Sequence, residues 1–350
     1  MKALYSLHAF LRRHLTWLER LLVAWGFTIL LAELLSARPV YPIYWDTVLL
    51  TGVFLLLLFW PTWGYFAALA IALYPLGEIS IYLAVLVLAT ALLGQHWFIP
   101  NLGLVLLIAG APFLNGIYLA WLVPLLGGLW WGPRAGLLAG ASGALWGKIL
   151  FGLLGLPPDW LSLSGLYPDL APTLLRFEGL TSWQVLEILT APLLADSTAT
   201  LYHLLQTIIW AFTGWLIGYL ALQDQVQYNR PRSTLAIIIG GVFLMSILQP
   251  LLSWWIGTAN PTEALLDNLL PNALLTLFAA GLFELFAFFV EYPWNPPPTV
   301  SASFHSPAKL IERETIHPSA PPTPAADTPN TPSRSKTDKD EESLIMIELD

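Results

Sequence analysis

The stretch Gly127–Lys148, GGLWWGPRAGLLAGASGALWGK, has the length of a helix but carries a glycine every few residues and ends in a lysine among apolar residues. Glycine costs about 1 kcal/mol relative to alanine inside a water-exposed helix, so its repetition needs a physical reason. Helices in a membrane gain no hydrophobic attraction for one another and associate through close backbone packing, which small residues permit. Small residues recur at every fourth position of this stretch: Gly132, Gly136, Gly140 and Ala144. The stretch therefore indicates a membrane helix packed tightly against its neighbours.

The composition of the whole chain supports a membrane protein. Of its 350 residues, 56% are hydrophobic and 11% are charged, whereas soluble domains carry about 25% charged residues. Apolar runs recur from residue 15 to residue 290, and runs such as VFLLLLFW (Val53–Trp60) lack the alternation of a membrane β-barrel strand. We therefore expect an all-α fold, a polytopic transmembrane helical bundle embedded in a lipid bilayer.

Several classes of function are disfavoured by what the sequence lacks. The chain has no cysteine, which excludes disulfides, thiol catalysis and thiolate metal sites. Its net charge of -8 argues against nucleic-acid binding, which needs a concentrated basic face. The sequence contains no GxSxG, HExxH or Walker-type glycine loop. We expect no catalytic residues, cofactor or metal, although an enzyme using outer-loop acids such as Asp159 and Asp169 stays open as a third alternative.

The apolar runs predict about ten spans, and eight is the alternative count. The expected spans are 17–36, 47–60, 64–76, 79–94, 99–111, 114–130, 134–155, 201–221, 233–256 and 269–290. Lys2, Arg12 and Arg13 place residues 1–16 in the cytoplasm by the positive-inside rule, and the predicted transmembrane domain extends over 17–292.

Two segments of the chain differ in character from the spans. The acidic loop 157–200 is expected outside the cell, and its apolar part, Trp183–Ala195, is short enough to be an interfacial helix. Residues 293–350 are rich in proline, serine, threonine and charge, so we expect a disordered cytoplasmic tail. Both termini are then cytoplasmic, in a multi-pass protein of the plasma membrane.

Polar side chains inside the bilayer are the candidate site, because burying them in hydrocarbon is costly. At 1.5 Å per residue, those of five spans lie about 21–27 Å from the cytoplasmic ends of their spans, within a core about 30 Å thick. These residues are Lys148, Asn115, Gln206, His203, Gln249 and Asn272. A shared layer predicts a pocket open to the outer face, with Lys148 anchoring an anionic or carbonyl-bearing ligand. Interhelical hydrogen bonding and outward extension of the lysine are the alternatives.

Glu284 lies in the last expected span, about 9 Å from its cytoplasmic end. At this depth it is a poor partner for Lys148. It is a candidate for carrying a proton or for pairing with Arg134, and a protonated, buried carboxyl is the alternative.

Residues 125–147, LLGGLWWGPRAGLLAGASGALWG, resemble a run found in the substrate-binding S components of energy-coupling-factor vitamin transporters. They are also similar to the membrane sensor domains of some bacterial signalling proteins. The first resemblance implies binding or transport of a small molecule, which is our leading expectation. The second implies a membrane sensor or scaffold whose cytoplasmic tail recruits a cytoplasmic or membrane protein partner.

Overall fold

The computed structural model contains two units, Met1–Trp294 and Asn295–Asp350. The described residues all belong to the first unit. They are 2–37, 40–42, 44–157, 159, 164–168, 176–177, 179–191, 193–194, 196–224, 226, 230–256 and 261–291. The predicted tail, 293–350, lies outside them.

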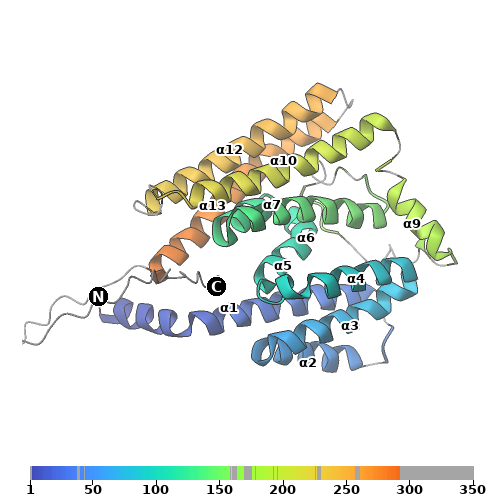
Figure 1. The fold of residues 1–350 in the computed structure, drawn as a ribbon, viewed down its shortest axis with the longest axis horizontal. Helices are drawn as coiled ribbons and strands as arrows, with labels where there is room; N and C mark the ends of the chain where they lie inside the picture. The colour runs from blue at the N-terminus through green and yellow to red at the C-terminus, as the bar shows by residue number, and fades with distance from the viewer. Residues whose placement is uncertain are drawn as a thin grey trace, which may run out of the picture. The chain divides into compact units, whose positions relative to one another are not determined.

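Every regular element in the described part of the chain is a helix, as the composition predicts (Figure 1). The helices are α1 (Lys2–Ala37), α2 (Trp45–Phe59), α3 (Pro61–Ile79), α4 (Ile81–Phe98), α5 (Leu102–Ala109), α6 (Ala111–Gly116), α7 (Leu122–Leu153), α9 (Ser182–Thr190), α10 (Ser197–Ala221), α12 (Arg230–Ile256) and α13 (Pro261–Glu291). One apolar core joins α1 to α4, and others join α7, α10, α12 and α13.

Six helices of the described part are long and apolar enough to cross a membrane. They are Ser6–Ala37, Ile81–Phe98, Leu122–Leu153, Ser197–Ala221, Arg232–Ile256 and Asp267–Val290. The expected count of about ten spans is not confirmed. The difference arises in the first half, where α2 has 15 residues, α5 has 8 and α6 has 6, whereas crossing the bilayer takes about 20.

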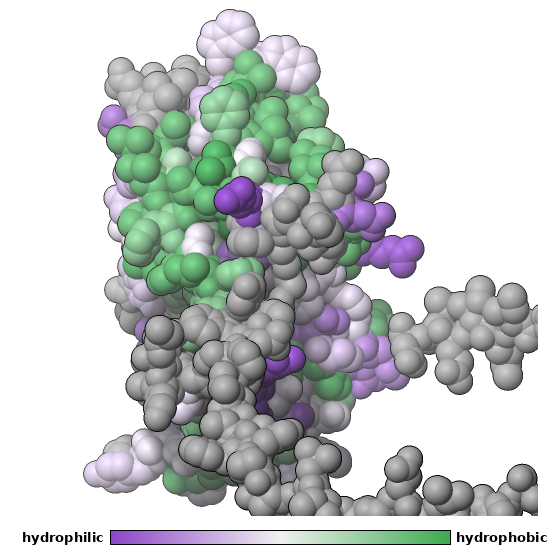
Figure 2. Space-filling model, turned by 90° about the vertical axis from the view of Figure 1, so that its left-hand side faces the viewer, coloured by the Kyte–Doolittle hydropathy of each residue, from purple (hydrophilic) through white to green (hydrophobic). Residues whose placement is uncertain are grey.

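The outward faces of the last helices are apolar. On α12 every fourth residue along one stripe is exposed: Leu235, Ile239, Phe243 and Ile247. On α13 the exposed stripe includes Leu274, Phe278 and Leu282. Hydrophobic residues also cover much of the upper part of the surface shown in Figure 2. Apolar surface of this extent is unfavourable in water and is what a helix presents to lipid, so the fold is compatible with an integral membrane protein.

The stretch that opened the sequence is not one helix but a hairpin. Gly132 has φ 84° and ψ -177°, which breaks α7 into Leu122–Trp131 and Pro133–Leu153. This backbone conformation is essentially restricted to glycine. The two halves pack against each other, since a Cβ built on Gly136 would lie 2.6 Å from the Cα of Gly128. The expected span 114–130 is therefore replaced by a helix of about 15 Å that begins only at Leu122.

The longer half of α7 packs along α10 through backbone contacts. A Cβ on Gly136 would lie 2.7 Å from the carbonyl carbon of Gly214, and one on Gly140 would lie 2.6 Å from that of Trp210. Gly136 on α7 contacts Gly214 on α10, and Gly140, four residues later on α7, contacts Trp210, four residues earlier on α10. The two helices are therefore antiparallel. The glycines allow this close packing, as the sequence indicates, whereas Gly132 forms the turn instead of continuing the stripe.

Among the described residues of the loop 157–200, the helix α9 coincides with most of the stretch predicted to lie at the interface. A capping box between Thr181 and Gln184 starts it. Val185 and Leu189, one turn apart, are buried in a cluster with the end of α7, while Trp183 is exposed. The amphipathic pattern thus forms the helix. Its position at a membrane interface stays a prediction.

Candidate functional site

Lys148 is among the largest fully buried side chains of the described residues, with 1% of its surface exposed. Its Nζ donates a hydrogen bond to Oε1 of Gln206 on α10 and lies 3.1 Å from Nδ1 of His203, one turn earlier. Removing an ammonium group from water costs several kcal/mol unless hydrogen bonds and opposite charge compensate. The structure therefore brings together three of the predicted residues and leaves Lys148 inside the bundle, with no outward extension of its side chain.

Gln206 links the lysine to a carboxylate. Its Nε2 donates to Oδ1 of Asp159 at 3.0 Å, while its Oε1 accepts from Lys148. The same Nε2 lies 3.5 Å from Oε1 of Gln249 on α12. One amide therefore bridges a cation and an anion and reaches a third helix. A primary amide suits this position because it presents a donor and an acceptor in one plane.

A tyrosine and a serine complete this network on the side of α12. The hydroxyl of Tyr202 donates to Oδ2 of Asp159 at 3.0 Å and lies 3.2 Å from Oγ of Ser253. Oγ of Ser253 in turn lies 3.4 Å from the carbonyl oxygen of Gln249. Lys148, His203, Gln206, Asp159, Gln249, Tyr202 and Ser253 are called the Lys148 network below.

Three members of this network, Asp159, Tyr202 and Ser253, were not among the predicted ligand-binding residues, although Asp159 was named as an acid for the enzyme alternative. Tyr202 and Ser253 each lie four residues from a predicted residue, Gln206 and Gln249, on the same helix face. That spacing is a signal that points to them. Asp159 follows the end of α7 in a connecting segment, where depth along a span has no meaning, so the estimate of shared depth did not include it.

The two predicted asparagines form a second group. Oγ of Ser164 donates to Oδ1 of Asn115 at 2.9 Å and accepts from Nδ2 of Asn272 at 3.0 Å. The backbone N–H of Gly165 also donates to the carbonyl oxygen of Asn115 at 3.0 Å. This group joins α6 to α13 through the segment that follows Asp159. The six predicted residues thus fall into two hydrogen-bonded groups, which the segment 157–168 links along the chain.

Within the described part of the chain, two buried amides each keep one polar atom without a hydrogen-bond partner. These atoms are Nε2 of Gln249 and Oδ1 of Asn272, and both side chains are 3% exposed. An unsatisfied buried polar atom costs about 1–3 kcal/mol. Each amide adjoins a proline inside a helix, Pro250 and Pro271 respectively. A donor and an acceptor are therefore available in the region that the sequence predicted as a pocket.

The beginning of the short half of α7 does not add an anion site. Half-helix N-termini within membranes often point their N–H groups at anionic substrates. Here the N–H of Leu122 donates to the carbonyl of Leu119 at 3.0 Å, and that of Val123 to Ala120 at 3.1 Å. The next residue, Pro124, has no N–H. The first donors of this helix are thus already used by the chain.

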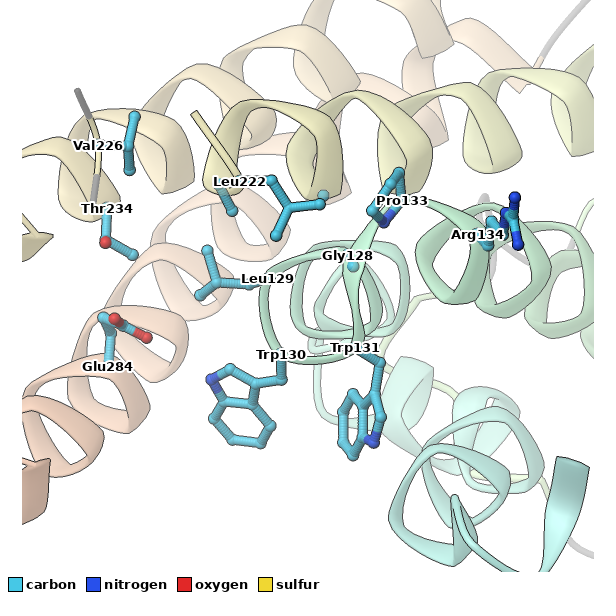
Figure 3. Close-up of a pocket in the computed structure, with 13 residues that line it drawn as sticks. Gly128, Leu129, Trp130, Trp131, Pro133, Arg134, Leu222, Val226, Thr234 and Glu284 are labelled. Carbon is cyan, nitrogen blue, oxygen red and sulfur yellow. The ribbon is translucent and has the colours of Figure 1, made fainter. Parts of the chain in front are cut away.

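Glu284 on α13 and Arg134, which follows the turn of α7, line a cavity of about 570 Å³ with the turn at Gly132 and the ends of α10 and α12. In Figure 3 the two side chains occupy opposite ends of this cavity, with Trp130 between them. Glu284 is buried and Arg134 is exposed. The predicted pairing of the two residues therefore stays a prediction, and the cavity they share is separate from the Lys148 network.

The described residues contain no group of three or more His, Asp or Glu side chains arranged to hold a metal ion. Fold and polar network together define a helical protein whose described part has six helices long and apolar enough to cross a membrane. A hydrogen-bonded cluster that includes Lys148 and Asp159 lies among these helices. No known protein family, curated protein or solved structure matches the chain.

Proposed function

We propose that this chain is an integral membrane protein that binds or transports a small molecule at the Lys148 network. One observation carries the proposal: Gln206 bridges the buried ammonium of Lys148 to the carboxylate of Asp159. Ionisable residues within transmembrane segments are rare and usually mark substrate or ion pathways. A purely structural contact between α7 and α10 is already provided by their glycines, so it needs no buried charge.

The chemistry of the network favours a ligand with a carboxylate or carbonyl oxygen. Such an oxygen accepts a hydrogen bond from Lys148 in place of the Gln206 amide oxygen. The unpartnered Nε2 of Gln249 offers a second donor to the same ligand. The resemblance of residues 125–147 to transporter S components also supports a small-molecule ligand.

The test is a thermal-shift screen of the purified protein in detergent against a panel of small carboxylates, amides and carbonyl compounds. We expect at least one compound to raise the unfolding temperature of the wild type and to leave Lys148→Met unchanged. Lys309→Met, outside the described residues and outside the network, is the control that removes an equal charge. A panel without any effect on the wild type, or equal shifts in Lys148→Met, would refute the assignment.

We also propose that the protein lies in the plasma membrane with both termini in the cytoplasm. Arg12 and Arg13 lie in the N-terminal part of the first candidate span, Ser6–Ala37, and an even number of spans returns the chain to the same side. Because the chain has no cysteine, single cysteines at Ser6 and Glu187 report on topology without background. A membrane-impermeant maleimide should label only the variant at Glu187 in intact cells, and the reverse pattern would invert the topology.

The second candidate function is a sensor or scaffold whose tail recruits a cytoplasmic protein. It is favoured by the division of the chain at Trp294–Asn295, which makes the tail a unit of its own. Deleting 295–350 should abolish partner capture in a crosslinking experiment in cells while the truncated protein keeps the unfolding temperature of the full chain. Unchanged crosslinks after the deletion would reject this function.

A further inference from the structure

The cavity beside the turn of α7 at Gly132 has the size of a ligand site and has no role in the proposed function. Its volume is about 570 Å³, and small-molecule pockets typically measure about 300–1,000 Å³. It forms where the hairpin turn at Gly132 meets Leu222 after α10, Thr234 on α12 and Glu284 on α13 (Figure 3). Lys148 lies fourteen residues beyond Arg134 along the same helix, about 21 Å away.

One end of this cavity carries an acidic side chain and the other end a basic one. Glu284 is 7% exposed, so its carboxyl group belongs to the interior. Arg134 is exposed and lies on the side of the cavity opposite Glu284 in Figure 3. Both residues line the same cavity. A cavity with an acid at one end and a guanidinium at the other complements a zwitterion, and it disfavours a ligand with a single negative charge at the Glu284 end.

The walls between these two side chains are apolar and aromatic and continue onto the exposed apolar side of α13. Leu129, Trp130 and Leu222 lie between Glu284 and Arg134 in Figure 3. Trp130 is 42% exposed, and its ring lies 5.9 Å from that of Phe283, which is itself exposed on α13. Tryptophan is enriched where a membrane meets water. With the membrane placement proposed above, the cavity would border both the lipid chains and the headgroup layer.

We propose that this cavity binds the headgroup of a zwitterionic phospholipid that carries a primary ammonium group. The ammonium group contacts the Glu284 carboxylate and the face of Trp130, since cations are attracted to indole rings. The phosphate extends toward Arg134, whose exposed side chain is long enough to meet it. The acyl chains follow the exposed side chains of α13 beside Phe283. The lipid is thus bound at a site separate from the Lys148 network.

Selectivity for the ammonium lipid depends on Glu284. A hydrogen bond to a charged group contributes about 1.5–3 kcal/mol, which corresponds to at least about a tenfold preference. An anionic headgroup without an ammonium group lacks this contact and meets a carboxylate. Glutamine in place of Glu284 keeps the size and removes the charge, so it should abolish the preference while the cavity persists.

The experiment uses the full chain in nanodiscs that contain equimolar phosphatidylethanolamine and phosphatidylglycerol. The protein is extracted in mild detergent, and the lipids that remain bound are counted by native mass spectrometry. We expect the wild type to retain phosphatidylethanolamine about tenfold over phosphatidylglycerol and Glu284→Gln to retain the two equally. Glu19→Gln removes an exposed acid of α1 that does not line the cavity, and it should behave as the wild type.

A second variant tests the site without changing its charge. Leu222→Trp enlarges a side chain at the cavity wall and should displace the retained phosphatidylethanolamine. Equal retention of both lipids by the wild type, or an unchanged preference in Glu284→Gln and Leu222→Trp, would overturn the proposal. The lipid should bind more tightly than glycerophosphoethanolamine, a soluble form of the headgroup, because its acyl chains also contact α13. Equal affinity for the two would identify the ligand as a soluble zwitterion and would refute the lipid assignment.

Discussion

A methyl group added at Gly140 should separate α7 from α10 and weaken the whole bundle. A Cβ at this position would overlap the carbonyl oxygen of Trp210, lie 2.6 Å from its carbonyl carbon and lie 2.9 Å from the nitrogen of Ala211. All three atoms are backbone atoms of a helix, so no side chain can rotate away. The obstruction can be relieved only by moving one helix relative to the other.

The size of this effect follows from the contact distances. Favourable contacts between carbon atoms lie at about 3.5–4.0 Å, so the helices must move apart by about 1 Å near Gly140. A gap of this size forfeits about a quarter to a half of the dispersion attraction of each affected contact. Overpacking of this kind costs about 1–3 kcal/mol. We therefore expect Gly140→Ala to lower the free energy of unfolding by that amount.

The assay is equilibrium unfolding in mixed micelles of dodecylmaltoside and sodium dodecyl sulfate, followed by far-UV circular dichroism. Gly240→Ala and Gly281→Ala are matched controls, because a Cβ on either helical glycine would meet nothing within 4 Å. These two variants should be neutral or stabilised by up to about 1 kcal/mol. Equal stability of Gly140→Ala and the controls would refute backbone contact between α7 and α10.

The remaining predictions concern the turn at Gly132, the pair formed by Lys148 and Asp159, and helix α9. Gly132→Ala should lose about 1–3 kcal/mol in the same assay, because the backbone conformation of Gly132 suits only glycine although the space beside it is open; wild-type stability would contradict this. Asp159→Asn should lose about 1–3 kcal/mol, and adding Lys148→Met should restore part of it, because neither charge then stays buried alone; strictly additive losses would disprove the coupling. Thr181→Ala removes a helix cap worth about 1 kcal/mol, so amide exchange in α9 should accelerate about fivefold while α10 is unaffected.

The sequence was sufficient to predict the class of the fold but not the number of spans. The composition and the apolar runs indicate membrane helices because both depend only on the solvent that surrounds them. The expected span count is not confirmed where an apolar run continues through a break in the helix. Gly110 lies between α5 and α6, and Pro112 lies in the first turn of α6. After α6 ends at Gly116, no helix follows until α7 begins at Leu122. Hydropathy does not detect these breaks, whereas the glycine and proline residues indicate them.

The candidate site could be predicted in part from depth along the spans. Residues at equal depth on packed helices are able to meet, and Lys148 does contact His203 and Gln206. Depth cannot specify which helices are neighbours, so it did not separate the group of Asn115 and Asn272 from the Lys148 network. Nor can it place a residue such as Asp159, whose position depends on the path of a connecting segment.

The glycines of the stretch Gly127–Lys148 determine where its lysine lies. Helices with ordinary side chains pack about 8–10 Å apart, whereas the backbones of α7 and α10 touch at Gly136 and Gly140. Lys148 lies two turns beyond Gly140 on the same helix, at the level of Gln206 on α10. Because the glycine contacts fix both the spacing and the antiparallel alignment, they place the ammonium group of Lys148 against the amide of Gln206. A change at Gly140 should therefore disturb the hydrogen bonding of Lys148 as well as the stability of the bundle, although the two residues make no direct contact.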